Sequence, residues 1–356
     1  MTDWERVTSF DSLYQSFLNV KSGRAQRPET IRFEQNLSFN LMNLREDLFS
    51  GEYQMMPYYH FILKEPKTRD VYAARFVDKL VMNVVCEQVL IPRLQPHLIE
   101  DNVACRKNKG VHYGIKRFTE FLRREYRQHG PELYVLKCDI SKFFMSIPHD
   151  VLLEKLMLRV KDKKVLNLLD VILKSYDSIS GTPGVGVPLG NNTSQWFALY
   201  YLSGLDHFVK EQLQVKSYIR YMDDFLLISH DKGFLWKCFM EIEGILTADL
   251  RLRLNPKTNV FPVRHGVEFL GWKFFLRDNG KVVRRLKLQS KKRYKVALQA
   301  LSRDYATGAK DLKKVKQILA SHQGHLIHGH AYSLEKRAMK RFVLVDRNRG
   351  GQTQVK

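Results

Sequence analysis

Residues 218–229 read Tyr-Ile-Arg-Tyr-Met-Asp-Asp-Phe-Leu-Leu-Ile-Ser, which places two short apolar segments on either side of Asp223-Asp224. This pattern predicts two strands bent around a pair of carboxylates. Carboxylates at buried strand ends are costly unless something positive neutralises them. The stretch taken alone is equally compatible with a hairpin turn that has no chemical role.

A third acidic residue follows a second apolar segment. Residues 133–138 predict a strand, and Asp139 comes directly after it. Mg²⁺ prefers carboxylate and phosphate oxygens, and two such ions about 3.5 to 4 Å apart can clamp the attacking and leaving oxygens of a phosphoryl transfer. Asp139, Asp223 and Asp224 are therefore candidate metal ligands.

The composition is that of a folded chain. Its 356 residues are 44% hydrophobic, which excludes the disordered class and predicts two or three packed parts. No run of 18 apolar residues exists, and the first residues lack the apolar segment of a signal peptide, so we expect a cytoplasmic protein with no membrane partner. The four cysteines show no Cys-x-x-Cys spacing, which disfavours a disulfide framework or a zinc knuckle.

The net charge of +22 is concentrated near the C-terminus. Residues 273–356 contain 22 basic and 5 acidic residues, a net charge of +17. A basic surface of this kind releases counterions from a polyanion on binding, so nucleic acid is the first expected partner and an anionic membrane surface the second. A solubilising extension is the alternative.

Strands and helices are mixed along the chain, which indicates an α+β fold. Apolar spacing and turn residues predict the following elements: helices over 9–52, a hairpin over 58–74, a helix over 76–93, a basic loop at 104–110, a helix from 150, a glycine-rich loop at 181–190, a helix over 191–213, a hairpin of 269–276 with 281–286, basic helices over 289–342 and a frayed 347–356.

Six motifs follow one another in a characteristic order. They are Lys64…Arg69, Asp139-Ile-Ser-Lys-Phe-Phe144, Gly186-Val-Pro-Leu-Gly-Asn-Asn-Thr-Ser-Gln195, Tyr221-Met-Asp-Asp224, Leu254-Asn-Pro-Lys257 and Phe269-Leu-Gly-Trp272. With these motifs the chain resembles the reverse transcriptase family over about residues 30–275. The resemblance implies a right-hand polymerase with an N-terminal helical extension (1–55), fingers and palm (56–275), a short basic helical thumb (276–346) and a disordered tail (347–356).

The resemblance implies roles for the residues that match. Asp139 and Asp223 would be the principal ligands of two Mg²⁺ ions, with Asp224 beside them, the Ile140 carbonyl as an extra ligand and Mn²⁺ as the alternative metal. Phe144 matches a steric gate that excludes a 2′-hydroxyl, although a core aromatic beside Phe143 is the other interpretation. Lys257 matches a lysine that protonates pyrophosphate; its alternative is a solvated loop lysine.

Other matches concern the nucleotide and the nucleic acid. Lys64 and Arg69 would hold the incoming triphosphate, with Arg75 as a competitor for that role. Leu189, Gly190 and Gln195 belong to the dNTP-binding segment. The primer grip would consist of Phe269, Leu270, Gly271 and Trp272, and Arg106, Lys107 and Lys109 would contact the template or form a solvated basic loop.

The histidines are a separate question. His112, His149 and the group His322, His325, His328 and His330 have no cysteine or acidic partners at metal-ligand spacing. We therefore expect them to be surface or RNA-facing residues.

Leu189 indicates which subtype of reverse transcriptase the chain resembles. Many family members carry Gln where this chain has Leu189, and an aliphatic side chain cannot hydrogen-bond near the nascent base pair. The segment looks like those of diversity-generating retroelement reverse transcriptases, bacterial or phage-encoded enzymes whose resemblance implies error-prone copying of template adenines. It also implies dNTPs, a template RNA, an RNA–DNA duplex and a small basic helical accessory protein that forms a pentamer. The alternatives are a phage-defence or abortive-infection reverse transcriptase and a non-catalytic RNA-binding protein.

Overall fold

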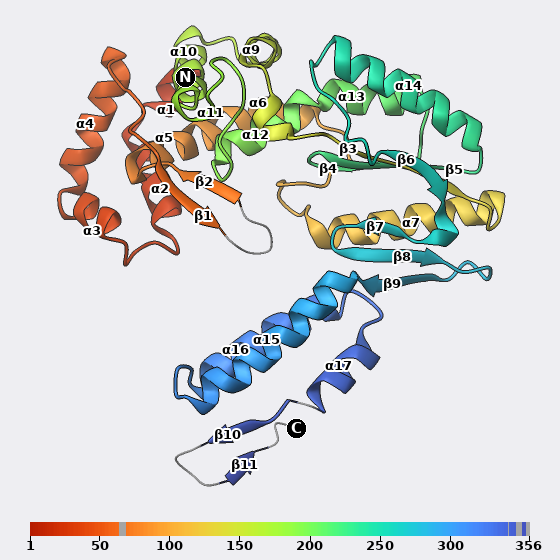
Figure 1. Cartoon of the computed structure of the whole chain (residues 1–356). Coiled ribbons are helices and arrows are strands. Elements are labelled where there is room, and N and C mark those ends of the chain that lie inside the picture. The colour runs from red at the N-terminus through yellow and green to blue at the C-terminus, as the bar shows by residue number, and fades with distance from the viewer. Residues whose placement is uncertain (64–68, 341, 347–350, 354–356) are drawn as a thin grey trace. The chain divides into compact units, whose positions relative to one another are not determined.

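The computed structural model of the chain describes residues 1–63, 69–340, 342–346 and 351–353 (Figure 1). The chain divides into two compact units. Unit 1 consists of Met1–Lys107, Cys138–Phe225 and Lys237–Thr258, and unit 2 of Asn108–Lys137, Leu226–Trp236 and Asn259–Lys356. Three elements pass from one unit to the other: β3 (Tyr134–Asp139), β5 (Asp224–Ser229) and α14 (Lys232–Ala248).

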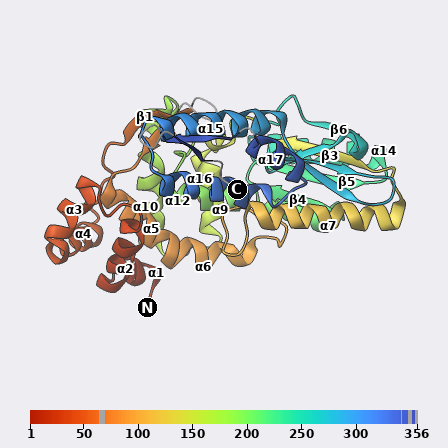
Figure 2. The same cartoon turned by 90° about the horizontal axis from the view of Figure 1, so that it is seen from below.

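Four helices begin unit 1, and they lie side by side in both views (Figures 1 and 2). They are α1 (Asp3–Val7), α2 (Phe10–Lys21), α3 (Pro28–Gln35) and α4 (Leu37–Ser50). Ser9 caps α2 by accepting a hydrogen bond from the Ser12 amide, and Pro28 begins α3, where its missing N–H costs nothing. The rings of Phe17, Phe33 and Phe76 pack together beneath these helices. The helical prediction for 9–52 is confirmed.

An antiparallel hairpin follows, as predicted. Strand β1 (Tyr59–Leu63) pairs with β2 (Arg69–Ala73) in a register that places Tyr59 opposite Ala73 and Leu63 opposite Arg69. The connecting residues 64–68 lie outside the described part of the chain. A helical segment comes next, consisting of α5 (Phe76–Val85), the π-helical turn η1 (Cys86–Leu90), α6 (Ile91–Leu94) and the 3₁₀ turn η2 (Gln95–His97).

Short helices build the remainder of unit 1. They are α8 (Phe143–Ser146), α9 (His149–Met157), α10 (Lys163–Lys174), α11 (Asp177–Ser180), α12 (Asn192–Tyr201), α13 (Ser203–His207) and the π-helical turn η3 (Phe208–Gln212). The single helix predicted over 191–213 is thus divided. The hydroxyl of Ser203 donates to the Tyr200 carbonyl (2.7 Å), a local bond that competes with the regular helix at the break.

A four-stranded sheet has the order β4-β5-β3-β6, with β4 at Tyr218–Tyr221 and β6 at Asn259–Pro262. Strands β3 and β6 are antiparallel, with Leu136 opposite Val260. Residues 225–229 of β5 are all buried, as their continuous apolar run predicts.

Unit 2 combines a three-stranded antiparallel sheet with helices. The sheet has the order β7-β8-β9, and Phe118 on α7 packs edge-on against Phe269 and Phe274 of its strands. The elements are α7 (Val111–His129), the 3₁₀ turn η4 (Val263–His265), β7 (Val267–Phe269), β8 (Trp272–Leu276), β9 (Val282–Leu286), α15 (Leu288–Ala306), α16 (Leu312–Leu326), α17 (Tyr332–Met339), β10 (Leu344–Asp346) and β11 (Gly351–Thr353).

The C-terminal part of unit 2 confirms one expectation and changes another. The prediction of basic helices over 289–342 is confirmed by α15, α16 and α17. The frayed or disordered tail expected at 347–356 is wrong for Gly351–Thr353, because β11 pairs with β10 and so satisfies its backbone groups. Residues 347–350 and 354–356 lie outside the described part. Among the described helices, none combines the length and the apolar character that crossing a membrane requires.

Candidate active site

The Asp223-Asp224 pair lies at a two-residue turn between β4 and β5. Met222 and Asp223 form the turn, and Asp224 is the first residue of β5. Met222 adopts the left-handed region with a φ of 55°, an uncommon conformation for a side chain of its size. The predicted bend between two apolar strands is confirmed, and both carboxylates are half-buried.

Asp139, the last residue of β3, lies near the β4–β5 turn. The backbone N–H of Ile140 donates to the carbonyl of Asp223 (3.3 Å), so the end of β3 lies directly beside the β4–β5 turn. The backbone segments that carry the three aspartates selected from the sequence are therefore neighbours.

Asn255 fastens Asp139 in position, a role that the sequence analysis did not assign. Its Nδ2 donates to Asp139 Oδ2 (3.1 Å), and its backbone N–H donates to the Asp139 carbonyl (2.7 Å). Its Oδ1 accepts from the Lys257 amide (3.1 Å), which forms an Asx turn. Lys257 itself is exposed. The signal in the sequence was the Asn-Pro-Lys run, because asparagine commonly organises the backbone two residues ahead.

A buried ion pair supports the turn from below. Arg220 and Asp206 are both 0% exposed, and the guanidinium donates from Nε to Oδ1 (2.7 Å) and from Nη2 to Oδ2 (2.5 Å). Its Nη1 donates to the Met222 carbonyl (3.0 Å), immediately before Asp223. The Tyr218 hydroxyl completes the group by donating to Asp206 Oδ1 (2.7 Å). This bidentate arrangement fixes the turn through its own backbone.

The negative charge of the site affects the pKa of Cys138, the residue before Asp139. Burial raises the pKa of the Cys138 thiol, and the charges of Asp224 and Asp139 raise it further. The local potential is therefore negative, which favours a cation. In the described part of the chain, no three His, Cys, Asp or Glu side chains are grouped closely enough to hold a metal ion on their own.

The donor set nevertheless fits Mg²⁺. The half-buried carboxylates of Asp139, Asp223 and Asp224 and the Ile140 carbonyl are all hard oxygen ligands. Mg²⁺ is commonly held by one or two carboxylates together with substrate phosphates rather than by a complete protein cage.

The glycine-rich loop lies against the segment that follows Asp139. The amide of Val187 donates to the Phe144 carbonyl (2.7 Å), and that of Gly186 donates to the Ile147 carbonyl (2.8 Å). A Cβ on Gly186 would lie 3.3 Å from the Met145 carbonyl oxygen at a φ of 94°, so glycine is needed for this close approach.

His149 holds this loop and is buried, so its predicted surface position is wrong. Its backbone N–H donates to the Gly184 carbonyl (2.8 Å), and its Nε2 lies 2.7 Å from the Gly186 carbonyl oxygen. The imidazole satisfies loop backbone that the apolar surroundings would otherwise leave without a partner.

The two phenylalanines after Asp139 divide their roles. Phe143 is buried and Phe144 is half-buried, with their rings edge-to-face at 5.6 Å. Phe143 therefore fills the core position, and Phe144 stays a predicted steric gate. In the neighbouring loop Leu189 is half-buried and Gly190 exposed at a φ of 102°, while Gln195 lies half-buried in the first turn of α12.

The predicted triphosphate-binding residues are only partly described. Lys64 lies outside the described residues, as does the side chain of Arg69, whose backbone begins β2. The competitor Arg75 is occupied elsewhere. Its guanidinium carbon lies 3.4 Å from the centroid of the Tyr59 ring, its Nε donates to the Pro57 carbonyl (2.9 Å) and its Nη1 lies 3.4 Å from Glu29 Oε1. These contacts favour a structural role for Arg75.

The predicted primer grip is the hairpin turn between β7 and β8 in unit 2. Leu270 and Gly271 both have positive φ angles, 47° and 84°, as a two-residue turn of this hand requires. Phe269 and Trp272, on either side, are 0% exposed. Gly329 lies against the indole: a Cβ there would overlap the six-membered ring of Trp272.

The predicted template contacts are spread over both units. In unit 1, Arg106 Nη1 donates to the carbonyls of Ile99 (2.7 Å) and Asn102 (3.1 Å), and Lys107 is exposed. In unit 2, Lys109 Nζ lies 4.3 Å from the centroid of the Tyr113 ring. Arg106 thus organises its own loop, and the exposed Lys107 is open to a phosphate.

The histidines of unit 2 gather near Trp272. The rings of His112 and His328 stack at 3.7 Å, and the His325 ring lies 5.4 Å from that of Trp272. Burial lowers the pKa of both His325 and His328, and the neighbouring imidazoles, His112 foremost among them, lower it further.

Comparison with known proteins agrees with this geometry. Residues 66–274, more than half of the chain, match the family described as "Reverse transcriptase (RNA-dependent DNA polymerase)". The curated protein YkfC of Escherichia coli (strain K12) is 26% identical over 277 residues, which cover 66% of this chain and 71% of that protein.

Comparison with solved structures finds partial similarity to two telomerases. The telomerase of Candida albicans in complex with a fragment of telomeric RNA is 14% identical over 73% of this chain and 52% of its own, with a TM-score of 0.48. Apo telomerase of Candida tropicalis is 14% identical over 65% of this chain and 49% of its own, also with a TM-score of 0.48. This chain spans about half the length of each.

Proposed function

The chain belongs to the reverse transcriptase family, whose right-hand polymerase fold its helices and antiparallel sheets adopt, and from this premise we propose that it copies RNA into DNA at Asp139, Asp223 and Asp224. The observation that carries the proposal is the hydrogen bond from the Ile140 amide to the Asp223 carbonyl (3.3 Å), which holds the two strand ends together. A protein that only bound RNA would gain nothing from acidic groups facing a polyanion.

The carboxylates are proposed to hold two Mg²⁺ ions, with the Ile140 carbonyl as an extra ligand and Mn²⁺ as the alternative. When bound, such ions lower the pKa of the attacking hydroxyl and neutralise charge on the leaving oxygen. The chain's own part is positioning: Asn255 orients the Asp139 carboxylate and Arg220 orients the Met222 carbonyl. Fixed groups of this kind need not reorganise as charge develops in the transition state.

Other residues would select the incoming nucleotide and assist the departure of pyrophosphate. Phe144 is held beside the glycine-rich loop by the Val187 amide, and we assign it the exclusion of a 2′-hydroxyl. Lys64 and Arg69 would hold the triphosphate. Lys257 is exposed on the Asx turn built by Asn255, so its ammonium is free to donate a proton to departing pyrophosphate.

The nucleic acid is proposed to bind the basic helices of unit 2. Most of the chain's excess positive charge lies in residues 273–356, and the Leu270–Gly271 turn presents backbone to a primer strand. Affinity for an RNA–DNA duplex should therefore fall steeply as salt is added.

Primer extension on an RNA template tests the polymerase proposal. Asp223→Asn removes one charge at nearly constant shape and should reduce Mg²⁺-dependent cDNA by at least about a hundredfold. Asp170→Asn is the matched control, because Asp170 pairs with Lys174 on the surface of α10 and should be silent. Equal synthesis by the two variants would contradict the assignment of Asp223. So would failure of the wild-type chain with its own RNA and any helical partner supplied.

We further propose that the enzyme is of the diversity-generating type, with a small basic helical, pentameric accessory protein. Leu189 is half-buried beside the exposed Gly190, and it cannot hydrogen-bond to a base. Sequencing of cDNA should show errors concentrated opposite template adenine, and Leu189→Gln should reduce them. Met157→Gln, the same kind of exchange at an exposed site on α9, is the control.

The error spectrum separates the alternatives. Faithful or untemplated cDNA from the wild-type chain would favour a phage-defence reverse transcriptase. A near-repeat pair differing at adenines in the neighbouring DNA, together with a short basic helical reading frame, would favour the diversity-generating type.

A further inference from the structure

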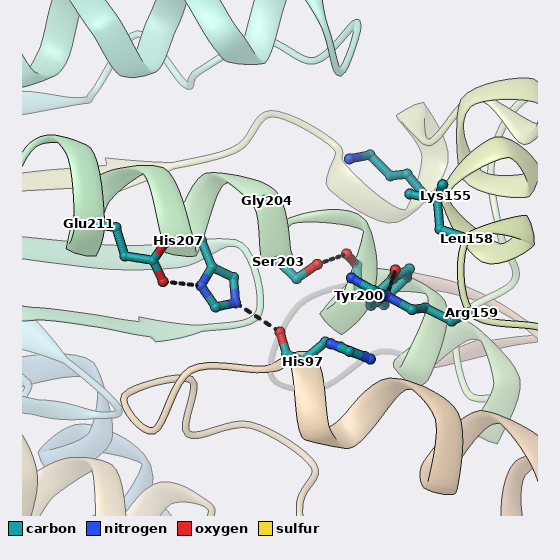
Figure 3. A pocket seen from close by; sticks show the side chains of 9 residues that line it. All are labelled: His97, Lys155, Leu158, Arg159, Tyr200, Ser203, Gly204, His207 and Glu211. Carbon is teal, nitrogen blue, oxygen red and sulfur yellow. Dashed lines mark hydrogen bonds and ion pairs between the residues drawn. The ribbon is translucent and has the colours of Figure 1, made fainter.

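Unit 1 contains a cavity of about 440 Å³ whose lining includes none of the residues assigned above to catalysis, nucleotide or primer (Figure 3). Its walls come from η2, from the end of α9 and from the α12–α13–η3 segment. The side chains used in the argument below are His97, Lys155, Arg159, Tyr200, His207 and Glu211.

Lys155 brings a positive charge to this cavity, and its Nζ lies 5.9 Å from the centroid of the Tyr201 ring. Its side chain is half-buried, and the described part of the chain offers it neither a hydrogen bond nor an ion pair. Gly204 lies beside the ammonium, because a Cβ added there would be in ordinary van der Waals contact with Lys155 Nζ (3.7 Å). Burial lowers the pKa of Lys155, and the charge of Asp249 opposes that shift.

Arg159 adds a second cation, whose side chain is exposed. Its Nε donates to the Tyr200 hydroxyl (3.2 Å), which orients the guanidinium, and within the described part of the chain its two Nη groups make no hydrogen bond. Tyr200 is itself buried, so the anchor is rigid.

The opposite wall carries two imidazoles. His207 is fixed by Glu211 Oε1, 2.6 Å from its Nδ1, and by the His97 carbonyl, 3.0 Å from its Nε2. The hydrogen bond with Glu211 raises the pKa of His207. Burial lowers the pKa of His97, and the charges of Arg159 and His207 lower it further. The lining therefore carries an excess of positive charge, because Glu211 is its only acidic group and is paired with His207, whereas Lys155 and Arg159 are both cationic.

We propose that this cavity is a binding site for a phosphate group, held between Lys155 and Arg159 on one wall and His97 on the other. An ammonium and a planar guanidinium are the side chains best suited to phosphate oxygens, and a bound dianion would remove the repulsion among the cations. A phosphate on a free nucleotide and one on an RNA strand share this chemistry. The proposal does not depend on polymerase activity, since the cavity uses none of the residues of that site.

Phosphate binding can be measured directly on the full chain with EDTA present, which prevents metal-dependent binding at the aspartates. Inorganic pyrophosphate, adenosine 5′-monophosphate and a short oligouridine are titrated while the imidazole C–H resonances of His97 and His207 are followed by NMR. The wild type should show saturable shifts of both rings. Lys155→Gln and Arg159→Gln should each weaken the affinity for pyrophosphate by about tenfold or more.

Two further variants keep the experiment decisive. Lys155→Arg retains the charge and should bind within a few-fold of the wild type, and Lys163→Gln removes an equal charge from an exposed position on α10 and should be silent. Stronger binding of oligouridine than of the mononucleotide would identify an RNA strand as the source, and the reverse order a nucleotide. Unchanged imidazole resonances, or equal weakening by Lys163→Gln, would overturn the proposal.

Discussion

Two hairpin turns of this molecule solve the same backbone problem in different ways. The β4–β5 turn of unit 1 places Met222 at a φ of 55°, and the β7–β8 turn of unit 2 places Leu270 at a φ of 47°. Both are large apolar residues in a conformation that usually belongs to glycine or asparagine, so each turn stores strain. The first presents Asp223, and the second is the predicted primer grip.

The two turns differ in what holds them. Beneath the first, the buried Arg220–Asp206 pair reaches the Met222 carbonyl through a directed hydrogen bond. The second rests on apolar packing, with Phe118 against Phe269 and with Trp272 covered by Gly329. A charge-assisted network fixes one carbonyl in one direction, whereas apolar packing tolerates small shifts. We infer that the position of Asp223, the proposed catalytic carboxylate, demands the stricter support.

Breaking the ion pair should have the largest effect. Arg220→Met leaves Asp206 buried without its cation, and unfolding should become easier by about 3–5 kcal/mol, measured by urea denaturation. The double variant Arg220→Met/Asp206→Leu should recover most of that stability but little cDNA synthesis, because the bond to the Met222 carbonyl is still missing. Full recovery of synthesis would refute the positioning role of Arg220.

One added methyl group at Gly329 should disturb the apolar packing beside the β7–β8 turn of unit 2. Gly329→Ala would push against the Trp272 ring and should destabilise unit 2 by about 1–3 kcal/mol, measured by thermal unfolding and amide exchange. Gly324→Ala, in α16 with open space around it, should instead stabilise the helix by about 0.5–1 kcal/mol. Identical effects of the two substitutions would mean that the contact with Trp272 is unimportant.

Substitution of Asn255 tests the polar contacts around the aspartates of unit 1, with a smaller expected effect. Asn255→Ala removes the hydrogen bond to Asp139 and the Asx turn before Lys257, and kcat/KM for primer extension should fall by about tenfold, in line with the ~1.5 kcal/mol of a charged hydrogen bond. Asn279→Ala removes a matching bond to the Lys281 amide in unit 2, where no carboxylate is involved. Steady-state kinetics on both variants should therefore separate turn stability from the orientation of Asp139.

The smallest effects should come from relieving strain at the turns themselves. Leu270→Asn places a residue that tolerates the left-handed region at a half-buried position and should stabilise its hairpin by about 0.5–1 kcal/mol in thermal unfolding. Met222→Asn relieves the same strain but loses the burial of the methionine side chain, so it should destabilise its hairpin by about 1 kcal/mol. Met222→Asn should also lower activity more than Leu270→Asn, since it changes the surface beside Asp223. The opposite order of activities would place the stricter constraint at the primer grip.

Much of the local structure could be predicted from the sequence. Asp139 was selected through the family resemblance, whereas the β1–β2 hairpin, the bend at Asp223-Asp224 and the basic helices α15–α17 all follow from apolar spacing and turn residues. These features depend on neighbouring residues, which is why a single sequence is sufficient for them.

The polar supports could not be predicted in the same way. Arg220 sits within an apolar strand, and nothing local shows that its partner is Asp206 on a helix or that the pair is wholly buried. His149 was expected to be surface or RNA-facing because it has no cysteine or acidic partner at metal-ligand spacing, and its hydrogen-bond partner, the Gly186 carbonyl, carries no sequence signal. The phosphate cavity combines His97 with Lys155 and His207, residues that only the tertiary fold brings together.

The three chain segments of unit 1 have a consequence for how the protein is made. Its last segment ends at Thr258, and the Asn255 that fastens Asp139 lies in that segment. Because the ribosome releases residues in order, the first 107 residues must wait for the other two segments before their apolar surfaces can be fully buried. Slow translation between Cys138 and Thr258 should therefore prolong exposure of the nascent chain to chaperones. No single cut of the gene would yield either unit as a complete, independent fragment.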